Sequence, residues 1–130
     1  MQSDQQVAIA DQYGVLIDGT ERDASSGETI DVVDPATGDR LTTVAAASEA
    51  DVNEAVDVAQ EGFETWRGYT PAKRCRILND VARAIRDEKE RFARIETLEN
   101  GKPISEARGQ IERTARHFEY YGGLADKVEG

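Results

Sequence analysis

Apolar and polar residues alternate along the first third of the chain, which is the period of a half-buried β-strand. Tyr13, Val15 and Ile17 share one side of a short strand that ends at the turn Asp18-Gly19. A β-branched run over 29–33 precedes a proline-glycine turn, and residues 41–45 follow as a return strand. We predict a hairpin there. Residues 1–12 are polar, and we expect them to form a flexible N-terminus.

From Ser48 onward the apolar residues recur at helical spacing. Each predicted helix has a local boundary signal: Ser48 caps the first, Pro71 opens the second, Gly101 stops the third and Pro103 opens the fourth. The predicted helices run over about 49–66, 71–87, 88–100 and 103–124. Strands followed by four helices, with no repeat, indicate an α+β fold.

Charge narrows the classes of function. The 130 residues include 26 acidic and 16 basic side chains, for a net charge of −10, and the acids are spread along the chain. An acidic surface repels nucleic acid and anionic membranes, so we expect neither as a partner. Because salt screens such self-repulsion, we form the hypothesis of a high-salt cytoplasm, such as that of haloarchaea. The start lacks a basic segment and an apolar run, and one cysteine fits a reducing compartment, so we expect a cytoplasmic protein.

Cys75 is the candidate thiol nucleophile, and it lies in a predicted helix between Arg74 and Arg76. Neighbouring arginines favour a thiolate, but a thiol inside a helix, far from its N-terminus, is usually inert. The lone histidine, His117, is typical of a solvated surface group. We therefore predict a structural role for Cys75 and no catalytic histidine.

Other candidate chemistry is weak. Glu96, Glu99 and Glu106 resemble an acid/base cluster, but such groupings arise by chance on the solvated faces of an acidic protein. The glycines form no phosphate-binding loop, and no cluster has the spacing of transition-metal ligands. The spacing of Trp66, Tyr120 and Tyr121 predicts that these aromatic residues pack against the protein. Taken individually, these residues indicate only an acidic α+β domain of unknown role.

A series of short motifs, read in order, changes this interpretation. They are Leu16-Ile17-Asp18-Gly19, Val33-Asp34-Pro35-Ala36-Thr37-Gly38, Ser48-Glu49-Ala50-Asp51-Val52, Phe63-Glu64-Thr65-Trp66, Pro71-Ala72-Lys73-Arg74-Cys75-Arg76-Ile77-Leu78, Glu96-Thr97-Leu98-Glu99-Asn100-Gly101-Lys102-Pro103 and Tyr120-Tyr121-Gly122-Gly123-Leu124-Ala125-Asp126-Lys127. Together they resemble the amino-terminal part of NAD(P)-dependent aldehyde dehydrogenases. Asp34 stands where that family usually has asparagine, a small change in turn chemistry.

The resemblance implies an enzyme that oxidises an aldehyde to a carboxylate through a cysteine thioester, with hydride transfer to NAD or NADP. It also implies that residues 13–130 are a partial cofactor-binding domain. The family's nucleophilic cysteine, glutamate base, oxyanion-binding asparagine and cofactor-binding glycines come after this segment. Cys75 matches a helix position and not the nucleophile. We therefore expect no turnover and no cofactor binding by this chain alone, and exposed apolar helix faces where the rest of the parent would pack. The expected partner is the remaining polypeptide, or a split-gene product, of a homo-oligomeric parent.

The resemblance also suggests two finer sites. The carbonyls of Val32 and Val33 and the carboxylate of Glu99 match positions that hold a structural monovalent cation, K⁺ or Na⁺, in many relatives. Arg113 and His117 lie on the helix that borders the aldehyde entrance in relatives, and a cationic pair there would favour a carboxylated aldehyde.

Three interpretations follow from these observations. The leading one is a piece of an aldehyde dehydrogenase, from a truncated gene, a split reading frame or a shortened expressed product. The second is a non-catalytic helical interaction module that pairs with a separate catalytic chain or with itself. The third, an unrelated acidic binding domain, requires the motif series to be a coincidence.

Overall fold

The computed structural model describes residues 7–127 of the chain. It divides into two compact units. The first contains the residues up to 64 together with 98–101, and the second contains 65–97 and the residues from 102 onward. Among the described residues, no helix has the length and apolar character needed to cross a membrane. Strands precede four helices, as expected of the α+β class.

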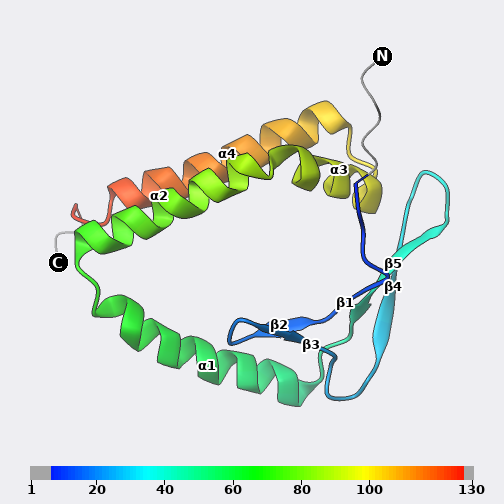
Figure 1. The fold of residues 1–130 in the computed structure, drawn as a ribbon, viewed down its shortest axis with the longest axis horizontal. Helices are drawn as coiled ribbons and strands as arrows, with labels where there is room; N and C mark the ends of the chain where they lie inside the picture. Colours follow the sequence, from blue (N-terminus) through cyan, green and yellow to red (C-terminus); the bar gives the residue numbers. More distant parts are fainter. Residues whose placement is uncertain (1–6, 128–130) are drawn as a thin grey trace. The chain divides into compact units, whose positions relative to one another are not determined.

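Five strands form two small sheets in the first unit (Figure 1). Their bounds are β1 Gln12–Tyr13, β2 Val15–Ile17, β3 Thr20–Arg22, β4 Thr29–Val33 and β5 Arg40–Ala45. β2 and β3 form a two-stranded antiparallel hairpin, and β5 lies between β1 and β4 in a three-stranded sheet. β4 and β5 are antiparallel, as the sequence predicts, whereas β1 is parallel to β5.

The predicted strand over Tyr13 to Ile17 is wrong in one respect, because it is broken at Gly14 into β1 and β2. The Gly14 N–H donates to Glu21 Oε1 at 2.8 Å and is therefore not used in a continuous ladder. A Cβ at this position would lie 2.3 Å from the carbonyl oxygen of Arg22, so the close approach of β3 requires glycine. The two halves consequently pair with different strands.

The turns of both hairpins follow from local chemistry. Asp18 and Gly19 have φ of 50° and 71°, the left-handed pair that a two-residue hairpin turn needs. In the β4–β5 turn, the Asp34 carboxylate accepts the Ala36 N–H at 2.8 Å and the Asp34 carbonyl accepts the Gly38 N–H at 2.8 Å. An aspartate oxygen thus performs the acceptor role that an asparagine oxygen has in such a turn.

Part of the expected flexible N-terminus is held in place. Thr42 Oγ1 donates to the Ala10 carbonyl at 2.7 Å, and the Thr43 N–H donates to the Asp11 carbonyl at 3.2 Å. Residues 1–6 lie outside the described part of the chain, so the expectation stays a prediction there.

All four predicted helices are confirmed, with boundaries close to those expected. Their bounds are α1 Glu49–Arg67, α2 Pro71–Asp87, α3 Lys89–Asn100 and α4 Ile104–Gly123. The α2 cap is typical: the Thr70 hydroxyl accepts the Lys73 N–H at 3.2 Å, and Pro71 occupies the first helical position. Gly101, with φ of 74°, ends α3.

Helices α2 and α4 run side by side and antiparallel in the second unit (Figure 1), and small residues are buried along both. Ala82 of α2 and Ala115 of α4 are fully buried, and Gly122 packs on the start of α2. No large side chain among the described residues is fully buried. Small side chains let the helix backbones approach closely, and they leave the unit with a thin apolar core.

Replacement of Gly101 by alanine is expected to lower the urea midpoint of unfolding. The left-handed backbone costs alanine about 1–2 kcal/mol, and its Cβ would lie 3.1 Å from Pro35 Cγ in the same unit. Gly27→Ala is the matched control, because Gly27 has φ of 71° but open space around it. Equal losses for both variants would show that the Pro35 contact contributes nothing.

Candidate functional site

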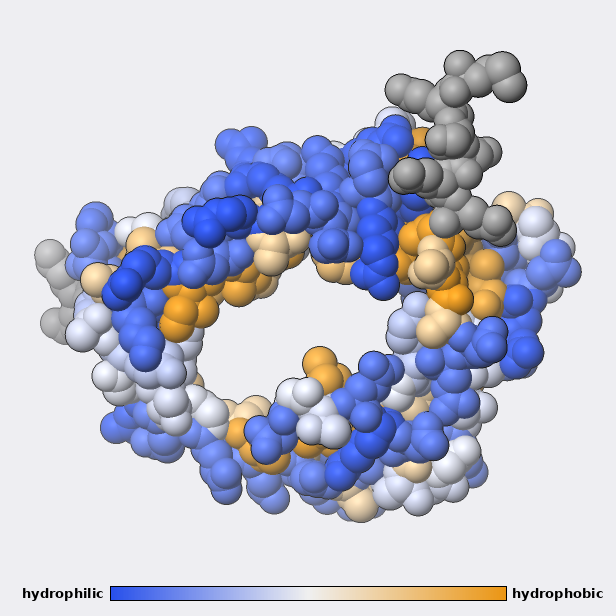
Figure 2. Space-filling model, in the orientation of Figure 1, coloured by the Kyte–Doolittle hydropathy of each residue, from blue (hydrophilic) through white to orange (hydrophobic). Residues whose placement is uncertain are grey.

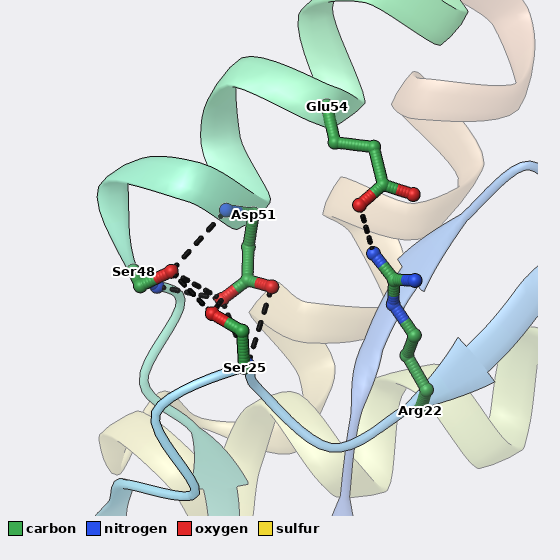
Figure 3. Close-up of polar contacts among 5 residues, drawn as sticks. All are labelled: Arg22, Ser25, Ser48, Asp51 and Glu54. Atoms are coloured by element: carbon green, nitrogen blue, oxygen red, sulfur yellow. Dashed lines mark hydrogen bonds and ion pairs between the residues drawn. The ribbon is translucent and has the colours of Figure 1, made fainter.

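The densest polar cluster joins the start of α1 to the loop between β3 and β4, within the first unit (Figure 3). The Asp51 carboxylate, 3% exposed, accepts hydrogen bonds from the backbone N–H and hydroxyl of both Ser48 and Ser25, at 2.8–3.2 Å. The Ser48 hydroxyl also bonds the Asp51 N–H, completing a reciprocal cap. The hydrogen bonds from Ser48 have the largest effect on the pKa of Asp51, and with those from Ser25 they lower it to about 2, although burial raises it.

Arg22 lies in β3, and its guanidinium forms an ion pair with Glu54 in α1. Glu54 is one turn beyond Asp51, so this ion pair reinforces the same junction. The hydrogen bond to Glu54 raises the pKa of Arg22. Every group in this cluster has a partner within the fold, and it contains no free nucleophile or base aimed at a cavity. Its role is to fix the start of α1.

A second network joins α2 to α4 in the second unit. Arg86 Nε donates to Glu112 at 3.0 Å, and its terminal nitrogens bond both oxygens of Glu119, one of them at 2.9 Å. Hydrogen bonds from Arg86 lower the pKa values of Glu112 and Glu119. Arg108 of α4 similarly binds Glu90 of α3 at 2.8–3.1 Å. These pairs align the helices and do not form a reaction site.

Cys75 lies in α2, half-buried, beside an open hollow of about 670 Å³. The side-chain amide of Asn79 donates to the Cys75 carbonyl at 2.8 Å and contacts its sulfur at 3.3 Å. Arg74 is engaged elsewhere, because it donates to the Tyr69 carbonyl at 2.6 Å. The hollow has a mainly apolar lining, and His117 is not one of the residues that line it. This arrangement supports the structural interpretation of the thiol.

Arg113 and His117 both lie exposed on α4, one helical turn apart, as the sequence predicts. Tyr120 and Tyr121 follow on the same helix and are each 63% exposed, with their rings edge-to-face at 5.3 Å. The prediction that these tyrosines pack against the protein is therefore wrong. Trp66 is half-buried and meets Tyr69 at 6.2 Å. A cationic and aromatic surface is thus open on this helix.

The three glutamates considered as an acid/base cluster have separate surroundings. Glu96 forms an ion pair with Lys102, which also donates to Gln110 at 2.6 Å. Glu99 is exposed near the end of α3, and Glu106 is exposed in the first turn of α4. In the described part of the chain, no group of three or more histidine, cysteine or acidic residues is arranged to hold a metal ion.

Val32 and Val33 lie at an irregularity of the β4–β5 ladder. Val32 pairs with Thr42 whereas Val33 pairs with Arg40, so the register shifts by one residue between them. A bulge of this kind leaves part of the ladder unpaired. The end of α3 belongs to the same unit, where Gly101 approaches Pro35 in the turn after β4. The three predicted cation ligands therefore come from neighbouring segments of one unit.

Sequence reasoning missed the long-range partners. Ser48 and Asp51 are recognisable as a cap from their spacing, but nothing adjacent in sequence marks Ser25 as the partner of Asp51 or Arg22 as the partner of Glu54. The close packing of Gly122 on Leu78, which would put a Cβ 3.3 Å from that side chain, was also missed. The double glycine at 122–123 is its one sequence signal.

Known proteins resemble this chain in both sequence and structure. The sequence matches the aldehyde dehydrogenase family over residues 22–130. PnpE from Pseudomonas sp. WBC-3, a structure of which is known in complex with nicotinamide adenine dinucleotide, is 43% identical with a TM-score of 0.86 over 94% of this chain. An NAD-dependent aldehyde dehydrogenase from Sinorhizobium meliloti is 40% identical with a TM-score of 0.89 over 98% of this chain. The chain spans about a quarter of the length of these relatives: 25% and 26%. With this match in sequence and fold, the chain belongs to the aldehyde dehydrogenase family.

Proposed function

We propose that this chain is a structural part of an NAD(P)-dependent aldehyde dehydrogenase and that it has no turnover of its own. The observation that carries the proposal is the family match over residues 22–130, combined with a span of only about a quarter of the relatives. The parent reaction is oxidation of an aldehyde to a carboxylate, with NAD or NADP as hydride acceptor.

The residues of this chain do not fit a dinucleotide. The sequence contains no glycine-rich phosphate loop between a strand and a helix. The hollow beside Cys75 has a mainly apolar lining and borders two helices without a sheet edge. Cofactor binding and chemistry therefore belong to the remaining polypeptide, and no reaction step is assigned to residues of this chain.

The test is to read the DNA directly downstream and to express its product together with this chain. We expect an in-frame or frameshifted continuation with a catalytic cysteine and a cofactor-binding glycine motif, and NAD(P)-dependent aldehyde oxidation by the pair. Downstream DNA without such a continuation would contradict the split-gene form of the proposal.

A non-catalytic interaction module is the alternative function, and one observation favours it: apolar side chains of α1 are exposed, including Phe63 at 57%. Such a module would form a stable complex with a separate, complete catalytic chain. Binding to a full-length aldehyde dehydrogenase, without any requirement for a truncated partner, would support this alternative.

We also propose that Arg113 and His117 favour a carboxylated aldehyde in the assembled enzyme. The support is their exposure one turn apart on α4. In that enzyme, Arg113→Ala is expected to lower kcat/KM severalfold for an aldehyde with a carboxylate, because an exposed ion pair contributes up to about 1 kcal/mol, or about fivefold. A neutral aldehyde should be unaffected.

Arg116→Ala is the matched control for that substitution, since Arg116 is also exposed on α4 and its loss changes the charge equally. The measurement is the ratio of kcat/KM for the carboxylated aldehyde to kcat/KM for the neutral aldehyde. The same ratio in the wild type and in Arg113→Ala would contradict the proposal.

We make two further proposals. One is that the protein works in a cytoplasm of high salt concentration, as in haloarchaea. The other is a K⁺ or Na⁺ site at Val32, Val33 and Glu99. Support for the first is the net charge of −10, and for the second the ladder irregularity beside two candidate carbonyl ligands. Oxygen ligands alone suit a hard monovalent ion.

One salt titration tests both. Screening predicts that the melting temperature rises equally in KCl and in N-methylglucamine chloride. A cation site predicts an additional rise in KCl or NaCl that Glu99→Gln removes and Glu106→Gln, at another exposed glutamate, does not. A melting temperature that fails to rise with any salt would contradict the high-salt proposal.

A further inference from the structure

The three asparagines of the chain occupy different positions in its helices. Asn53 lies near the start of α1. Asn79 lies within α2, where its side-chain amide donates to the Cys75 carbonyl at 2.8 Å. Asn100 is the last residue of α3, and it is exposed. Asn100 is therefore the one asparagine at the C-terminal end of a helix, where fraying costs little free energy.

The residue that follows each asparagine also differs. Acidic residues follow Asn53 and Asn79, and these residues lie inside helices, where backbone N–H groups donate to carbonyl oxygens four residues earlier. Gly101 follows Asn100, is exposed and has φ of 74°, a left-handed conformation that ends the helix. Because glycine has no Cβ, its backbone nitrogen is also the least crowded. The Asn100–Gly101 pair thus combines an exposed side chain with an accessible backbone nitrogen.

We propose that Asn100–Gly101 is a site of spontaneous deamidation, and that the reaction weakens the end of α3. Asparagine is a thermolabile residue. The Gly101 backbone nitrogen forms a bond to Asn100 Cγ, and the bond from Cγ to the side-chain nitrogen breaks. The side-chain nitrogen leaves as ammonia with the proton that the backbone nitrogen has lost, so a cyclic succinimide remains. Water then opens the ring. Opening at Cγ gives aspartate, and opening at the main-chain carbonyl carbon gives isoaspartate, whose main chain runs through Cβ and Cγ.

Both products place a carboxylate at the C-terminal end of α3. The last carbonyl groups of a helix carry partial negative charge, so an anion there is unfavourable. Glu99 precedes the new carboxylate, and Lys102, the nearest basic residue in the sequence, already forms an ion pair with Glu96. Hydrophilic residues cover much of the face that Figure 2 shows, and the net charge is −10. One further negative charge therefore adds to the self-repulsion of the chain.

The isoaspartate product also lengthens the main chain by one carbon atom directly before Gly101. This glycine lies close to the turn after β4, because a Cβ on it would lie 3.1 Å from Pro35 Cγ. The end of α3 and Pro35 belong to the same unit. A longer main chain must shift this contact, so the deamidated chain should unfold at a lower urea concentration than the fresh chain.

The experiment incubates the purified 130-residue chain in mildly alkaline buffer, both folded and in guanidinium chloride. Peptide mapping by mass spectrometry measures the converted fraction of each asparagine, and chromatography against synthetic peptides separates aspartate from isoaspartate. Asn100→Gln is the matched control, because it keeps a side-chain amide but would have to close a larger ring. The urea midpoint of unfolding is measured before and after the incubation.

We expect Asn100 to convert in the folded chain at a rate within about tenfold of the rate in guanidinium chloride, because helix ends open at little cost. Asn53 and Asn79 should stay unconverted in the folded chain. The urea midpoint of the wild type should fall during the incubation, whereas that of Asn100→Gln should not. An unconverted Asn100 in the folded chain, equal conversion of all three asparagines there, or an unchanged midpoint of the converted wild type would each overturn the inference.

Discussion

Ala82→Leu and Ala115→Leu are each expected to unfold the α2–α4 unit at a temperature where the wild type is folded. Both alanines are fully buried on helices that lie side by side, so a larger side chain would displace the groups packed around it. Overpacking costs about 1–3 kcal/mol, a large share of the stability of a chain with so thin a core. Thermal unfolding followed by circular dichroism measures the effect.

Ala84→Leu is the matched control, because Ala84 lies exposed on the same helix as Ala82. It should leave the melting temperature near that of the wild type, since leucine and alanine are both good helix formers. Wild-type melting of Ala82→Leu would contradict the close helix contact that the structure shows.

The stability of the first unit is expected to fall as the pH drops from about 4 to about 2, and Asp51 is expected to account for a distinct part of that loss. Its pKa in the folded chain is about 2, below the ordinary aspartate value of about 3.9. A lowered pKa stabilises the folded state above the unfolded pKa, and this contribution is lost as the pH falls through the folded pKa. Protonation removes the negative charge that strengthens the hydrogen bonds from Ser25 and Ser48 to this carboxylate.

Asp51→Asn isolates this contribution. The variant should be less stable than the wild type at pH 7 and should show a flatter profile between about pH 4 and about pH 2, because it has no charge to lose there. Asp57→Asn, an exposed position on the same helix, should keep the wild-type profile. The measurement is the urea midpoint at each pH. Parallel profiles for the wild type and Asp51→Asn would show that the capping network contributes no pH-dependent stability.

The elements that sequence predicted well are those with local boundary signals. Thr70-Pro71 and Gly101 mark where α2 begins and α3 ends, and Asp18-Gly19 marks a hairpin turn, because backbone preferences at these positions depend on the residues themselves. The family resemblance was also within reach, since it depends on the order of many such motifs, and the comparisons confirm it.

What sequence could not supply depends on residues far apart in the chain. The break at Gly14 follows from the approach of Arg22 in a strand with no clear period of its own. The junction of Ser25 with Asp51 spans 26 residues, and no local pattern encodes it. Exposure of Tyr120 and Tyr121 was mispredicted because helical spacing shows which residues share a face, but not whether anything covers that face.

The most direct test of the central claim is NAD(P)-dependent oxidation of a panel of small aldehydes in high KCl by the purified 130-residue chain alone. The proposal predicts no NADH or NADPH formation above the rate without protein, because the nucleophile and the cofactor site belong to the remaining polypeptide. Turnover that Cys75→Ser abolishes would contradict it, and would make the hollow beside Cys75 an active site.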